Sequence, residues 1–126
     1  MNKKLIISLF VVILSIAGFS TTGASAAESD DTFLGNGAKT STTSRITVKS
    51  GEKLNIRVQG FPNSGNFSYA IFKNGSRYQD YVGGKDGVIT HTLNPGTGDY
   101  SLRLYCGLPT NLKNNCSAIG VISSKK

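Results

Sequence analysis

The chain has 126 residues, with 14 Lys and Arg against 7 Asp and Glu, and a formal net charge of +7. This length leaves room for one domain with a modest core. One histidine and 2 cysteines are too few for a zinc site built from four Cys or His ligands.

The first 26 residues have the pattern of a secretory signal peptide. "MNKK" is basic, "LIISLFVVILSIAGF" is apolar, and "STTGASA" ends in small residues at Ala24 and Ala26. The apolar stretch is shorter than the roughly 20 residues that span a bilayer. We therefore expect residues 1–26 to be removed and residues 27–126 to form one secreted domain without a membrane span. The lysine-led leader is typical of a Gram-positive bacterium.

The segments that follow the leader are predicted from polarity and hydrophobic period. Residues 27–31 are polar and expected to be frayed, residues 32–37 are expected to form a short first strand, and residues 38–43 a polar connector. From Ser44 onward, apolar and polar residues alternate with the two-residue period of half-buried strands. The alternation predicts strands at "RITVK" (45–49), "LNIRVQ" (54–59), "FSYAIF" (67–72), "RYQDYV" (77–82), "VITHTL" (88–93), "DYSLRLYC" (99–106) and "CSAIGVIS" (116–123).

The turns between these segments carry their own signals. "KNGS" contains Asn74-Gly75, which is a strong hairpin signal, and "GFPNSGN", "GGKDG" and "NPGTG" are rich in Gly, Pro and Asn. No stretch after the leader has a helical period. Short strands at intervals of about 8–12 residues are typical of a β-sandwich. We predict an all-β fold, a single antiparallel sandwich of jelly-roll or immunoglobulin-like type with seven to eight strands.

The two cysteines, Cys106 and Cys116, enclose "GLPTNLKNN" (107–115). Their C-x9-C spacing does not fit a CxxC redox motif, and His91 alone cannot complete a metal site. Paired cysteines in a small secreted domain predict a disulfide. Closing such a loop stabilises the fold by about 2–3 kcal/mol on the chain-entropy model.

Three segments between Ile46 and Tyr105 follow a familiar order: "ITVKSGEKLNIRVQG", "SYAIFKNGS" and "ITHTLNPGTGDYSLRLY". They resemble the bacterial pre-peptidase C-terminal type of β-sandwich. The resemblance implies a binding or accessory module of the kind found in secreted enzymes. Some members bind calcium through acidic residues, but the corresponding "NSGNFSY" here has no carboxylate, so calcium is not implied. Tyr100 is also similar to the tyrosine of immunoglobulin-like corners, which implies a structural hydrogen bond.

Catalytic groups are sparse. His91, the only histidine, shares a strand face with Ile89 and Leu93, which predicts a partly buried residue rather than a catalytic base, and no G-x-S-x-G elbow is present. No spacing suggests paired carboxylates; the acids stand singly beside turns or in the polar tail (Glu52, Asp80, Asp86, Asp99, Asp30 and Asp31). We expect no enzyme activity, no catalytic residues, no metal and no cofactor. A hydrolase centred on His91 remains the enzymatic alternative.

Binding is the remaining class of function. "SRYQDYV" and "SLRLY" place aromatic residues beside arginines, and such pairs suit stacking on a sugar or peptide and forked contact with phosphate or carboxylate. The candidate ligand-binding residues are Arg77, Tyr78, Tyr81, Arg103 and Tyr105. If their two strands were neighbours, Arg77, Tyr78, Arg103 and Tyr105 would form one patch. Ordinary cross-strand packing is the competing interpretation of the tyrosines.

The charge of the secreted part points to an anionic partner. Of the 14 Lys and Arg, Lys3 and Lys4 fall in the leader, which leaves 12 basic against 7 acidic residues and a net charge of +5. An excess of this size also suits simple solubility. We predict a secreted monomer that binds an anionic cell-wall polymer or polysaccharide, and no nucleic acid. The alternative is a secreted effector, an antimicrobial protein or an inhibitor of a protease or lytic enzyme, that presents loop 107–115 to another protein.

Overall fold

The structure is a computed structural model that describes residues 28–126. The predicted leader, residues 1–26, lies outside the described residues. Within them the chain forms ten strands: β1 (Ser29–Leu34), β2 (Thr40–Thr42), β3 (Ile46–Val48), β4 (Lys53–Gly60), β5 (Phe67–Lys73), β6 (Ser76–Val82), β7 (Gly87–Leu93), β8 (Gly98–Leu108), β9 (Asn111–Leu112) and β10 (Ala118–Lys125).

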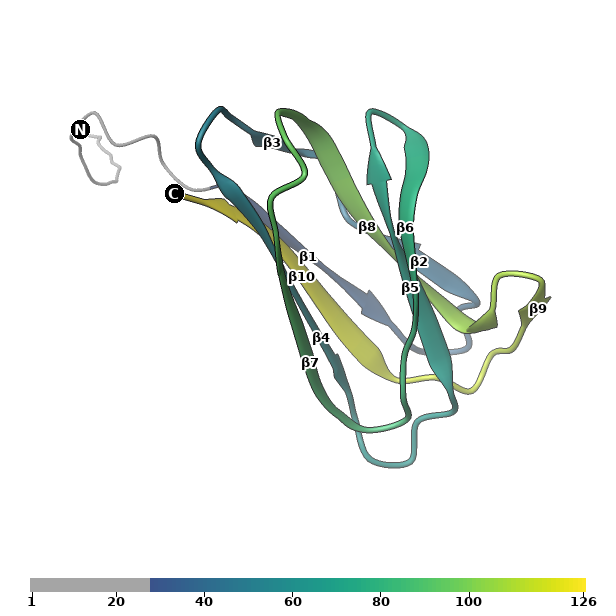
Figure 1. Cartoon of the computed structure of the whole chain (residues 1–126). Helices are drawn as coiled ribbons and strands as arrows, with labels where there is room; N and C mark the ends of the chain where they lie inside the picture. The colour runs from purple at the N-terminus through teal and green to yellow at the C-terminus, as the bar shows by residue number, and fades with distance from the viewer. Residues whose placement is uncertain (1–27) are drawn as a thin grey trace, which may run out of the picture.

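The strands form two antiparallel sheets that face each other in a sandwich, as predicted (Figure 1). One sheet has the order β1-β10-β4-β7. The other has the order β2-β8-β5-β6, and the short strands β3 and β9 also pair with β8. Strand β8 is the longest and organises its sheet, while the loop that carries β9 projects beyond the end of the sandwich in Figure 1.

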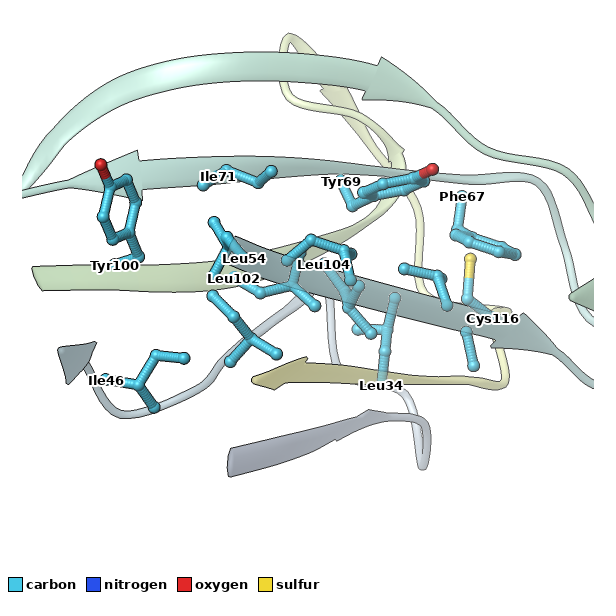
Figure 2. Close-up of a cluster of buried hydrophobic side chains, with 14 of the residues drawn as sticks. Leu34, Ile46, Leu54, Phe67, Tyr69, Ile71, Tyr100, Leu102, Leu104 and Cys116 are labelled. Carbon is cyan, nitrogen blue, oxygen red and sulfur yellow. The ribbon is translucent and has the colours of Figure 1, made fainter. Parts of the chain in front are cut away.

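The core lies between the sheets because each strand sends alternate side chains inward. On β4 the inward residues are Leu54, Ile56 and Val58, and on β8 they are Tyr100, Leu102, Leu104 and Cys106; all are buried. Figure 2 shows leucines from both layers meeting at the centre. Gly120 on β10 permits the close contact, because a Cβ there would lie 2.7 Å from Leu102 Cδ2.

Tyr100 ties the β7–β8 turn to the core. Its ring is fully buried, and its hydroxyl lies 3.0 Å from the Pro95 carbonyl oxygen and 2.8 Å from that of Gly96. The hydroxyl proton is therefore donated to the turn that precedes the strand. The predicted structural hydrogen bond of Tyr100 is confirmed.

Three expectations about the ends and connectors were wrong. Residues 27–31 were expected to be frayed, but β1 begins at Ser29, and Asp30 accepts a hydrogen bond of 2.6 Å from the Ser44 backbone nitrogen. The expected connector 38–43 contains β2, and the loop 107–115 contains β9, so there are ten strands instead of seven or eight. The reason is that edge strands can be held by backbone pairing alone and need no apolar alternation.

Candidate functional site

The outer face of the six-stranded sheet gathers basic and aromatic side chains around β5. This strand presents Ser68, Ala70 and Phe72 to the outside, and Ala70 stands between Arg103 on β8 and Asp80 on β6 in the pairing register. The short side chains of Ser68 and Ala70 leave space for long neighbours to lie across the strand. Phe72 becomes the aromatic centre of this face.

Arg77 reaches this centre because of an irregularity in β6. The β5–β6 register shifts between Ile71 and Phe72, so that Ile71 pairs with Gln79 while Phe72 pairs with Arg77. Such a bulge re-aims side chains. The Arg77 guanidinium carbon lies 5.3 Å from the centre of the Phe72 ring, and the side chain is paired with Asp80. The bond to Asp80, more than any other contact, raises the pKa of Arg77.

Arg103 lies on the other side of β5 and is less engaged. Its guanidinium carbon is also 5.3 Å from the centre of the Phe72 ring, and its Nε donates to the Thr42 hydroxyl at 2.9 Å. Within residues 28–126 its terminal nitrogens have neither a carboxylate nor another hydrogen-bond acceptor. The guanidinium groups of Arg77 and Arg103 thus both lie against the Phe72 ring, and only that of Arg77 is paired with a carboxylate.

Arg45, just before β3, extends a third guanidinium towards the β5–β6 turn. A Cβ built on Gly75 in that turn would lie 2.7 Å from Arg45 Nη2. Gly75 has φ +88°, which glycine adopts without steric cost. We call Arg77 and Arg103, which lie on the Phe72 ring, together with Arg45 beside the β5–β6 turn, the arginine cluster. Cation–π contact with Phe72 holds Arg77 and Arg103 in place without neutralising them.

The five candidate residues fall into three places. Strands β6 and β8 are not neighbours, because β5 lies between them. Arg77 nevertheless bridges the gap by donating from Nη2 to the Tyr105 hydroxyl at 3.1 Å. Tyr105 is only 4% exposed, so its ring supports Arg77 instead of presenting a free stacking surface.

The other two tyrosine rings pack against other tyrosines, not against Phe72. Tyr78 meets the Tyr100 ring edge-on, with Lys73 Nζ 5.8 Å from the Tyr78 ring centre. Tyr81 points between the sheets and stacks on Tyr69. Sequence reasoning missed Phe72 and Arg45; a large aromatic on an otherwise small, polar strand face was the available signal for Phe72.

His91 is a partly buried strand residue, as predicted. It stacks on Tyr81 with ring centres 4.1 Å apart, and its Nε2 lies 2.6 Å from the Tyr69 hydroxyl. Burial lowers the pKa of His91, while burial and the nearby Tyr81 raise the pKa of Tyr69 to about 12. At neutral pH both groups are therefore uncharged, and together with Tyr81 they close the edge of the sandwich between β6 and β7.

Acidification through the histidine range is expected to lower the free energy of unfolding. Since burial depresses the pKa of His91 in the folded state, the unfolded chain, with a histidine pKa of about 6.5, binds the proton more readily. The contribution of neutral His91 to the free energy of unfolding is therefore fully present above the unfolded pKa, and it is lost as the pH falls through the lower, folded pKa. Urea unfolding between about pH 7 and about pH 5 measures this. His91→Gln should have a flatter profile, and equal slopes for the two chains would contradict the account.

The cysteines form the predicted disulfide, Cys106–Cys116, with both residues buried. The enclosed loop is held further by Lys113 N, which donates to Cys106 O at 2.8 Å, and by Gly107 N, which donates to Asn66 O at 2.8 Å. The pairing of β9 with the end of β8 completes a small closed unit.

Residues 28–126 contain neither a metal-ligand group nor a membrane-spanning helix. No three His, Cys, Asp or Glu side chains come together there as a metal site, and no helix there is long and apolar enough to cross a membrane. No protein-family model and no curated protein matches the chain.

Proposed function

We propose that this protein is a secreted binding module that is held on an anionic polymer of the bacterial cell envelope by its arginine cluster. The observation that carries the proposal is the pair of guanidinium groups, Arg77 and Arg103, on the single ring of Phe72. Like charges brought together repel, and Asp80 compensates only Arg77. An anionic group beside Arg103 would supply the missing charge.

The net charge of +5 on residues 27–126 supports the same proposal. It attracts polyanions at a distance, whereas the cluster supplies a fixed place of contact. Arginine is suited to this role because its planar fork matches phosphate and carboxylate oxygens. The contact of His91 Nε2 with the Tyr69 hydroxyl supports binding over hydrolysis, since it engages the ring nitrogen that a catalytic base would use.

Removing two cluster charges should weaken retention on cell walls. We expect Arg45→Gln/Arg103→Gln to bind insoluble Gram-positive walls about tenfold more weakly, which corresponds to about 1.4 kcal/mol. Sedimentation with native walls, and with walls stripped of anionic polymer, measures the retained fraction. Arg77 is left intact because it also bonds Tyr105 within the fold.

The matched control removes the same charge from the other sheet. Lys53 and Arg57 are exposed on β4, and Lys53→Gln/Arg57→Gln should bind native walls nearly as well as the unaltered chain. Equal losses in both variants would mean that bulk charge acts without the cluster. Equal binding to native and stripped walls would refute the anionic polymer as the ligand.

A further inference from the structure

A groove separates the end of β6 from the disulfide-closed loop. It consists of two hollows of about 400 Å³ and about 680 Å³ that share Val82 and Leu108 in their walls. Tyr69 and Tyr81 line the smaller hollow, and Pro109 borders it from the loop. We call the two hollows together the loop groove. Volumes of this size fall within the range of ligand sites.

The loop groove concentrates exposed apolar surface. Val82 is 79% exposed and Leu108 47%, and these are two of the six large hydrophobic side chains that are exposed among residues 28–126. Val82 and Leu108 come from different strands but meet at the same hollows. Apolar side chains gathered in this way, with a polar rim, are typical of an interaction site.

The loop wall of the groove is preorganised. The disulfide closes it, β9 pairs Leu112 with Gly107, and Ser68 Oγ donates to Gly107 O at 2.8 Å. Gly107 has φ +80°, and a Cβ there would lie 2.6 Å from Asn111 O, so only glycine fits this turn. A wall fixed before binding lowers the entropy that a partner must lose.

The polar groups of the groove suit a peptide. Asn66, Asn111 and Asn115 line the larger hollow, and asparagine amides can both donate to and accept from main-chain groups. Strand β6 runs beside the smaller hollow and is an edge of its sheet. An extended segment can lie along the groove between β6 and the loop and place alternate side chains in adjacent hollows.

The charges of the groove define the partner further. Lys113 is the only charged residue that lines the larger hollow. In the smaller hollow Arg77 and Asp80 neutralise each other. The groove therefore complements a segment that carries an apolar side chain and a carboxylate.

We propose that the loop groove binds an extended acidic segment of a partner protein. An apolar side chain of that segment occupies the smaller hollow, against Val82 and Leu108, and a carboxylate pairs with Lys113 at the larger one. The loop thus acts as one wall of a binding groove rather than as a free-standing inhibitory loop. This site is separate from Arg45 and Arg103, although Arg77 lies at the boundary between the two.

Selection from a random peptide library displayed on phage tests the proposal, with the disulfide-intact secreted chain as bait. We expect enriched sequences that combine a large apolar residue with Asp or Glu a few positions away. The synthetic form of the best sequence should bind Leu108→Ser and Lys113→Glu at least tenfold more weakly. It should bind Val88→Ser normally, because Val88 is an equally exposed hydrophobic residue on the opposite sheet.

The arginine cluster provides the second control. Arg45→Gln/Arg103→Gln should bind the selected peptide as the unaltered chain does, even if its retention on cell walls is lost. Peptide binding that disappears with this variant would place the acidic peptide on the cluster and overturn the groove. Failure to enrich any sequence, or undiminished binding to Leu108→Ser and Lys113→Glu, would overturn it as well, whatever the wall experiment shows.

Discussion

Leu104→Ala is expected to lower the free energy of unfolding by about 3 kcal/mol, within the range of about 2–5 kcal/mol for buried leucines. Leu104 is fully buried on β8 and lies opposite Gly120 of the other sheet, whose Cβ position would be 3.1 Å from Leu104 Cδ2. The β10 backbone cannot easily move inward because it is paired on both sides. The vacated volume should therefore remain as a cavity.

Leu108→Ala is the matched control on the same strand. Leu108 is half exposed at the loop groove, so this change should cost less than about 1 kcal/mol. Urea unfolding of both variants measures the difference between the two losses of unfolding free energy. We expect the slope of that free energy against urea concentration to be the same for both variants. Similar losses for the two leucines would contradict the placement of the core between the sheets.

Removal of the disulfide should produce the second large loss. Cys106→Ala/Cys116→Ala is expected to lower the free energy of unfolding by about 2–3 kcal/mol, because the unfolded chain regains the freedom of a short closed loop. Alanine is preferred to serine here since both positions are buried and a hydroxyl would need a partner. Urea unfolding under non-reducing conditions gives the value.

The same variant should loosen the loop groove while the sandwich remains. Limited proteolysis should cut within residues 107–115 faster than elsewhere, because β9 is too short to hold the loop by its pairing with β8 alone. Unfolding free energies that match those of the disulfide-bonded chain, together with unchanged proteolysis, would contradict a structural role for the disulfide.

The central strands could be predicted from sequence because their alternation reports directly on burial. β4 and β8 lie between other strands and keep a two-residue period along almost their whole length. β1 lacks a clear signal because its two aspartates point to solvent or to the Ser44 backbone. β2 consists only of Ser and Thr, and its place is fixed by pairing with β8, which a local sequence window does not reveal.

The arrangement of the candidate site could not be predicted for a related reason. A strict two-residue period in β6 would place Arg77 and Tyr81 on the same face. The register shift at Ile71 and Phe72 instead turns Arg77 outward and leaves Tyr81 between the sheets, since a shift of one residue exchanges the two faces. Residue types identified the right strands, but a bulge decided which side chains meet.

The cysteine spacing, by contrast, predicted the disulfide without knowledge of the fold. What it did not indicate is that the closed loop lies against Val82 and forms a groove with it. That contact depends on β6 and β8 lying in the same sheet with β5 alone between them. The proposed peptide site is therefore a product of strand order rather than of any motif.

The salt dependence of binding to a soluble glycerol-phosphate polymer tests the central claim most directly. For the unaltered chain, the logarithm of the dissociation constant should rise linearly with the logarithm of the salt concentration, as counterions are released from a phosphodiester chain. Arg103→Gln should reduce that slope by about 1, as expected for one lost phosphate contact, while Arg57→Gln should leave the slope unchanged. Binding that is independent of salt, or the same slope for all three chains, would contradict the arginine cluster as the polymer-binding site.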